Sequence, residues 1–209
     1  MPRTLYVGSK RYSSWSLRPY LALAHARIEF TTETIPLDRP DTKQRIAAVN
    51  PTGKVPVLHD SGLVIGDSLA ICEYAAELAP DAGLWPADRA TRARARAIAC
   101  EMHAGFVALR REMPMDLGAH KPGVGRTPES LADIARVTQI WRDELAASGG
   151  PFLFGAFTIA DAMFAPVVTR FVSYAVELDA ACAKYVHAIG ELPAMRAWTH
   201  DAAKESASR

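Results

Sequence analysis

Three hydroxyl side chains, Ser13, Ser14 and Ser16, lie close together near the start of the chain. They follow a short apolar run that ends at Gly8, and they open a periodic apolar pattern that is typical of a helix. A hydroxyl at this position can cap the free N–H groups of the helix. It can also stabilise a thiolate, because a hydrogen-bond donor and the positive helix end together lower the pKa of a thiol. The residues alone leave both roles open.

A second segment, residues 50–58, places Val55 and Pro56 at the start of a short apolar strand. A trans proline there would only begin an edge strand. A cis bond would turn the Val55 backbone outward, where it can pair with a bound extended peptide. Lys54 precedes this pair and is either a solvated loop lysine or a charge that contacts the same ligand.

Asp67 and Ser68 begin the next helical pattern. As a simple cap, either side chain accepts hydrogen bonds from the helix N-terminus, which is worth about 1 kcal/mol. As a binding pair, the Ser68 hydroxyl and the neighbouring N–H groups would hold a carboxylate, and Asp67 would hold an ammonium group.

The elements that must position these residues fall into two groups that meet near residue 80. In the first group the order of patterns is βαβ–α–ββ–α, which predicts a small sheet with a parallel first pair and a hairpin at the other edge. The β-type runs are residues 4–7, 28–35, 55–58 and 63–65, and the helical patterns are residues 15–26, 42–49 and 67–77. A proline-rich break follows, and the later patterns are all helical: residues 90–112, 128–147, 159–176, 180–189 and 192–204.

The composition is that of an ordinary globular protein, with 209 residues, 49% hydrophobic and 22% charged. A net charge of +1 gives no support for nucleic acid or an anionic membrane as a partner. Cys72, Cys100 and Cys182 lack metal-ligand spacing, so we expect no metal and three buried free thiols. The sequence also lacks a recognisable signal or membrane-spanning segment, and we expect a cytoplasmic protein.

Taken together, these motifs resemble those of the cytosolic glutathione S-transferases over nearly the whole chain. Residues 13–23 resemble the serine-type segment of the zeta and tau types, residues 50–58 the N-P-x-G-x-V-P-x-L signature, and residues 67–68 the E/D-S pair. Residues 154–161 resemble the G-x-x-x-[ST]-x-x-D capping box, in which Thr158 and Asp161 begin a helix. The resemblance implies a thioredoxin-like α/β domain over 1–80, a linker over 81–86 and an all-α helical-bundle domain over 87–209.

The resemblance assigns the activation of the glutathione thiol to Ser13. Ser14 and Ser16 are substitutes, and Tyr12 is the second choice as donor because other classes use a tyrosine. No general base is needed, because the bound thiolate is itself the nucleophile.

The resemblance also assigns the glutathione-binding residues. It implies a cis bond at Pro56 and backbone pairing of glutathione at Val55. Asp67 and Ser68 would hold the γ-glutamyl group, and Lys54 would contact the glycyl carboxylate.

The second substrate is expected against the first long helix of the C-terminal half, where several side chains recur at helical spacing. The residues expected around it are Tyr12, Trp15, Met102, His103, Phe106 and Arg110. An apolar wall suits a hydrophobic electrophile, and Arg110 would suit an acidic one. The same stripe also fits a core face or a dimer interface.

The resemblance therefore implies a transferase that conjugates glutathione to a small electrophile, as in detoxification, and a homodimer. An isomerase, a peroxidase, a dehalogenase and a noncatalytic binding module remain alternatives. Trp15 stands where zeta-type isomerases have a cysteine, which disfavours isomerisation. The first cysteine is Cys72, which disfavours disulfide exchange through an enzyme thiol.

Overall fold

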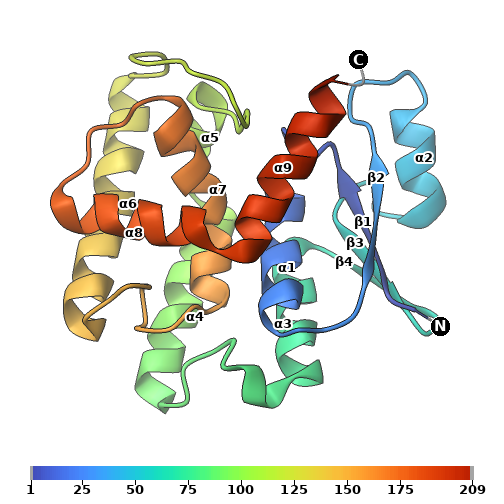
Figure 1. The fold of residues 1–209 in the computed structure, drawn as a ribbon, viewed down its shortest axis with the longest axis horizontal. Helices are drawn as coiled ribbons and strands as arrows, with labels where there is room; N and C mark the ends of the chain where they lie inside the picture. The colour runs from blue at the N-terminus through green and yellow to red at the C-terminus, as the bar shows by residue number, and fades with distance from the viewer. Residues whose placement is uncertain (1, 208–209) are drawn as a thin grey trace.

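A computed structural model describes residues 2–207 and shows a mixed four-stranded sheet with helices, followed by a bundle of helices (Figure 1). This confirms the predicted fold class. The first half comprises β1 (Thr4–Gly8), α1 (Ser14–His25), β2 (Thr31–Ile35), α2 (Thr42–Val49), β3 (Val57–Asp60), β4 (Leu63–Gly66) and α3 (Ser68–Leu78). The second half comprises η1 (Pro80–Ala82), α4 (Arg89–Ala104), α5 (Val107–Glu112), α6 (Pro128–Ser148), α7 (Ile159–Ser173), α8 (Ala180–Glu191) and α9 (Pro193–Ala207).

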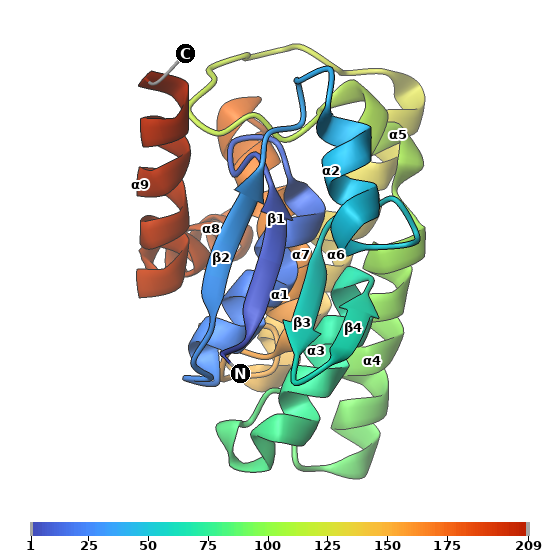
Figure 2. The same ribbon diagram turned by 90° about the vertical axis from the view of Figure 1, so that its right-hand side faces the viewer.

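The sheet has the strand order β2-β1-β3-β4. β1 runs parallel to β2 and antiparallel to β3, and β3 forms a hairpin with β4. The parallel pair requires a crossover, which α1 supplies. Helices α1 and α3 pack together on one side of the sheet, and α2 lies on the other side (Figure 2). The sheet therefore brings the start of α1, the start of β3 and the start of α3 close together.

The centre of the second half is α7, which buries every residue except Val172. A helix that is buried on all sides belongs in a core, and α7 packs against both α1 and α4. Its start is fixed by the predicted capping box: the Asp161 carboxylate accepts hydrogen bonds from the backbone N–H groups of Thr158 at 2.8 Å and Leu153 at 3.0 Å. The contact between α7 and α1 joins the two halves.

The continuous helix predicted over residues 90–112 is interrupted. Helix α4 ends at Ala104 and α5 begins at Val107, and between them Phe106 has a left-handed backbone with φ 59° and ψ 43°. The guanidinium of Arg110 donates to the carbonyls of Met102, His103 and Gly105, which the break leaves without helical partners. The Arg110 side chain thus replaces the missing helical hydrogen bonds. The helical spacing of apolar residues continues across the break, which is why the sequence predicted one helix.

The cysteine prediction needs one correction. All three are free thiols, and Cys72 and Cys182 are buried, but Cys100 is exposed. The buried positions of α4 are Ala95, Ile98, Ala99 and Met102, which share one face, and Cys100 lies outside that stripe.

Candidate functional site

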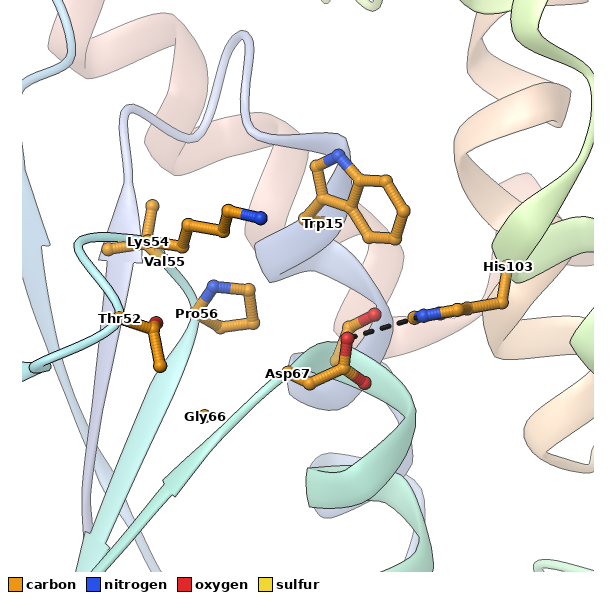
Figure 3. A pocket seen from close by; sticks show the side chains of 9 residues that line it. Trp15, Thr52, Lys54, Val55, Pro56, Gly66, Asp67 and His103 are labelled. Atoms are coloured by element: carbon orange, nitrogen blue, oxygen red, sulfur yellow. Dashed lines mark ion pairs between the residues drawn. The ribbon is translucent and has the colours of Figure 1, made fainter.

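A cavity of about 660 Å³ opens where the two halves meet (Figure 3). It is lined by Trp15 of α1, by the loop before β3, by the end of β4 and start of α3, and by His103 of α4. The lining residues are Trp15, Thr52, Lys54, Val55, Pro56, Gly66, Asp67, Ser68 and His103. The fold therefore brings together the two segments, residues 50–58 and 67–68, to which the resemblance assigned glutathione binding.

The start of α3 has the strongest marks of a ligand site. Asp67 is a non-glycine residue with φ 78°, a conformation that costs of order 1–3 kcal/mol and is concentrated at functional sites. Its carboxylate caps the helix by accepting from the N–H groups of Leu69 at 2.8 Å and Ala70 at 3.2 Å. The Ser68 hydroxyl is buried and has no hydrogen-bond partner among the described residues. Because buried hydroxyls are normally bonded, this oxygen marks a place for a polar ligand group.

The loop before β3 forms the opposite wall. The Val55–Pro56 peptide bond is cis, as the resemblance implied. The side-chain amide of Asn50 donates to the Lys54 carbonyl at 2.7 Å and so fixes the loop that carries both residues. The Lys54 side chain is exposed, and its ammonium lies at the cavity (Figure 3).

Ser13 is the residue before α1, but its side chain does not cap that helix. Its hydroxyl instead donates to the Ser16 hydroxyl at 2.7 Å, which also accepts from the Gly8 N–H at 3.1 Å. Ser13 is 5% exposed and does not line the cavity, whereas its neighbour Trp15 does. Tyr12 is 41% exposed and likewise does not line it.

The predicted second-substrate residues separate into two groups. Trp15 and His103 line the cavity, whereas Met102 and Phe106 are 0% and 7% exposed and belong to the core. Their burial corrects the expectation that they form a substrate wall, because the Met102 side of α4 packs inward. Arg110 does not line the cavity either, since its guanidinium is tied to the carbonyls at the helix break.

Sequence reasoning did not single out Thr52 and Gly66 as cavity residues. Thr52 lies within the 50–58 signature, and Gly66 directly precedes the Asp67-Ser68 pair. A Cβ added at Gly66 would lie 3.2 Å from the Asn50 amide nitrogen, so the glycine allows the loop to approach β4 closely.

His103 connects the two halves of the site. Its Nε2 atom lies 3.3 Å from a carboxylate oxygen of Asp67, and its ring meets Trp15 edge-on at a centroid distance of 5.3 Å (Figure 3). Burial lowers the pKa of His103, and the charges of Arg18 and Arg110 lower it further against the opposing effect of Asp67. The imidazole therefore forms a polar part of the cavity wall between Asp67 and Trp15.

Family models match both halves of the chain: the glutathione S-transferase N-terminal domain matches residues 12–78, and the C-terminal domain matches residues 124–200. Glutathione S-transferase GstA of Escherichia coli O157:H7 is 30% identical over 195 residues, which are 90% of this chain and 92% of that protein. The chain belongs to the glutathione S-transferase family. A probable maleylacetoacetate isomerase of Caenorhabditis elegans is 39% identical over 105 residues, which are 50% of this glutathione S-transferase and 48% of that protein. That second alignment spans only about half of the relative.

Solved structures of the family share the whole fold of this glutathione S-transferase. A glutathione transferase homologue from Burkholderia gl BGR1, with bound glutathione, has a TM-score of 0.75 at 23% identity and covers 98% of this chain and 99% of its own. A diazinon-metabolizing glutathione S-transferase of the silkworm Bombyx mori has a TM-score of 0.74 at 21% identity, with coverages of 98% and 99%. At these identities the likeness shows the fold alone.

No described helix combines the length and apolar character needed to cross a membrane. Within residues 2–207, no group of three or more His, Cys, Asp or Glu side chains has an arrangement that could hold a metal ion.

Proposed function

We propose that this glutathione S-transferase binds glutathione in the cavity and catalyses the attack of its thiolate on an electrophilic carbon of a small second substrate. The observation that carries the proposal is the buried, unpartnered hydroxyl of Ser68 in the cavity, beside the Asp67 carboxylate. The zwitterionic γ-glutamyl end of glutathione presents a carboxylate and an ammonium group. These two groups complement the Ser68 hydroxyl and the Asp67 carboxylate.

The remaining contacts follow from the length of the tripeptide. The exposed ammonium of Lys54 is suited to the glycyl carboxylate, and the backbone of Val55 is suited to pairing with the extended cysteinyl unit. A tripeptide that runs from Asp67 and Ser68 to Lys54 in this way would place its thiol near the start of α1. There Ser13 is the proposed donor, after its hydroxyl turns from Ser16 toward the sulfur.

Replacing Ser13 by alanine is expected to raise the pKa of the bound glutathione thiol toward the ordinary thiol value of about 8.5. The rate of conjugation, as kcat/KM, should fall about 100-fold, as it does when one donor to a developing or bound anion is removed. The pKa is measured from the ultraviolet absorbance of the thiolate in the bound complex as a function of pH.

Tyr12→Phe is the matched control, since it removes the neighbouring hydroxyl only. We expect it to leave the thiol pKa unchanged. If Tyr12→Phe shifts the pKa and Ser13→Ala does not, the donor is Tyr12. If neither variant nor wild type turns over any electrophile while glutathione still binds, the chain is a binding module.

Ser68→Ala is expected to weaken glutathione binding about tenfold or more, because the variant loses a hydrogen bond to a charged group. The same change should leave stability unchanged or slightly higher, because it removes a buried hydroxyl without a partner. Calorimetric titration with glutathione and urea denaturation measure the two effects. Ser61→Ala, in the turn between β3 and β4, is the control and should change neither affinity nor thiol pKa. A loss of stability without a loss of affinity in Ser68→Ala would contradict the assignment.

A glutathione-dependent isomerase is the second candidate, because a probable maleylacetoacetate isomerase is among the matched relatives. Isomerisation returns glutathione unchanged, whereas conjugation consumes it. Assaying maleylacetoacetate for isomerisation, with glutathione consumption followed in parallel, separates the two activities. Trp15, which replaces the expected cysteine, favours conjugation.

We also propose that the chain acts as a cytoplasmic homodimer in detoxification. The resemblance suggests this assembly, and the edge strand β4 supplies an apolar surface through Leu63 and Val64, which are 54% and 50% exposed. Sedimentation equilibrium measures the oligomeric state directly.

A further inference from the structure

Three arginines from three helices gather beside the cavity: Arg18 of α1, Arg110 of α5 and Arg170 of α7. The guanidinium carbons of Arg18 and Arg110 lie 4.3 and 4.7 Å from the centre of the Trp15 ring. Trp15 itself lines the cavity. The charges of Arg110 and Arg170 both act on Arg18, and Arg110 also acts on Arg170, so the three groups form one cluster. We call these residues the arginine cluster.

Arg18 is completely buried, and none of its three guanidinium nitrogens has a hydrogen-bond partner among the described residues. One nitrogen each of Arg110 and Arg170 is also buried without a partner. Burying a cation without a hydrogen-bond partner is among the most unfavourable arrangements in a protein, and nearby like charges add to its cost. The cation–π contact of Arg18 with the Trp15 ring offsets only part of this cost.

Among the described residues, no carboxylate forms a hydrogen bond or ion pair with the guanidinium groups of the arginine cluster. Asp67 raises the pKa of Arg18 and Asp133 raises the pKa of Arg110, but in both cases the opposing effect of burial is larger. Burial first, and then the charges of Arg110 and Arg170, lower the pKa of Arg18 well below its ordinary range. Burial likewise lowers the pKa of Arg170 to about 9. The site therefore has an excess of positive charge and of unused N–H donors.

We propose that the arginine cluster is an anion-binding site behind Trp15, and that it takes a carboxylate group. Arginine presents a planar fork of N–H donors that matches the two oxygens of a carboxylate. Arg18 supplies a complete unused fork, and Arg110 supplies one further donor. A bound carboxylate would satisfy these donors and cancel one of the three like charges.

The position of the cluster indicates which carboxylate it would hold. One side chain, Trp15, contacts both the cavity and the guanidinium groups of Arg18 and Arg110. Movement of this indole would join the cluster to the cavity. A second substrate with a carboxylate could then place that group against Arg18 while its electrophilic carbon stays near the thiol. This last step rests on the proposed conjugation activity, whereas the anion site itself does not.

The site is tested first without glutathione. Sodium formate replaces sodium gluconate at constant ionic strength, and the midpoint of thermal unfolding is recorded. Gluconate is the reference anion because it carries the same charge on a much larger molecule. We expect a saturable rise in the midpoint for wild type, because an anion that binds only the folded state stabilises it by mass action. The rise should be absent in Arg18→Met, which replaces the buried guanidinium by an apolar side chain of similar length.

Arg89→Met is the matched control, because Arg89 is exposed at the start of α4 and the substitution is the same. It should respond to formate as wild type does. A wild type that shows no saturable rise overturns the proposal, and so does an equal rise in Arg18→Met. If Arg18→Met does not fold, formate binding is measured instead from the broadening of the ¹³C-formate NMR line by wild type. Saturable broadening supports the anion site, and its absence overturns the proposal.

Whether the cluster holds a substrate carboxylate is tested with two electrophiles that differ in one substituent, the anionic 4-chloro-3-nitrobenzoate and the neutral 4-chloro-3-nitrobenzamide. Their rates of reaction with free glutathione are measured to correct for the difference in intrinsic reactivity. Wild type and Arg89→Met should prefer the benzoate in kcat/KM, and the preference should fall about tenfold or more in Arg18→Met, as expected for a lost charged hydrogen bond. An unchanged preference in Arg18→Met would mean that the cluster does not hold the substrate carboxylate. If neither compound reacts, the proposed function fails for these electrophiles, and the formate titration still decides whether the anion site exists.

Discussion

Asp161→Ala is expected to lower the free energy of unfolding by about 3 to 5 kcal/mol, because it leaves two buried N–H donors without an acceptor. These donors belong to Leu153 and Thr158, and Asp161 is 0% exposed, so water cannot replace the carboxylate. The lost contacts start α7, the helix at the centre of the core. Urea denaturation followed by circular dichroism measures the change.

Asp179→Ala is the matched control. Asp179 also accepts from two backbone N–H groups at a helix start, those of Ala181 and Cys182, but it lies at the surface. Its replacement should cost only about 1 kcal/mol, because water can solvate the exposed groups. Equal losses in the two variants would show that burial does not determine the importance of Asp161.

The Asp161 carboxyl also makes stability depend on pH. Burial raises the pKa of Asp161 to about 6, against the opposing effect of the hydrogen bonds from Leu153 and Thr158. The unfolded chain has the ordinary value of about 3.9. Between these values the folded state binds the proton more tightly, so the stability of wild type relative to Asp161→Ala should fall as pH rises from about 4 to about 6. Above pH 6 the difference should be constant.

The sequence predicts the fold well where a period or a local motif determines it. The order of strands and helices follows from the apolar patterns, and the capping box at Thr158 and Asp161 is a local arrangement of hydrogen bonds. The break at Gly105 and Phe106 is different. The apolar period continues across it, and the compensating contact comes from Arg110, whose role becomes visible only in three dimensions.

The candidate site shows the same division. Asp67, Ser68 and the 50–58 segment could be recognised because they are contiguous signatures, and the fold brings them to one cavity. Met102 and Phe106 could not be assigned correctly, because a helical stripe looks the same whether it faces a core or a substrate. Arg18 could not be recognised at all, since an arginine in a helical pattern normally indicates a solvated face. Its burial depends on the packing of α1 against helices that are distant in the sequence, such as α3 and α7.

Gly125→Ala is expected to lower the free energy of unfolding by about 3 kcal/mol or more, because it combines a left-handed backbone with a steric clash. Gly125 has φ 75°, and an added Cβ would lie 2.5 Å from the carbonyl oxygen of Glu112 and 2.9 Å from the Met113 side chain. The Met113 carbonyl accepts from Arg170 at 2.9 Å, so the displaced segment also holds one member of the arginine cluster.

Gly123→Ala separates the two contributions. Gly123 lies in the same loop and has φ 77°, but an added Cβ would meet nothing within 4 Å. Its replacement should therefore cost only the conformational term, about 1 to 2 kcal/mol. Urea denaturation of both variants gives the clash energy as the difference between them, and equal losses would show that the loop moves away from Glu112 at no cost. If the clash displaces Met113, the rise in thermal midpoint caused by formate should be smaller in Gly125→Ala than in wild type. The rise should persist in Gly123→Ala, because only the Gly125 substitution disturbs the segment that holds Arg170.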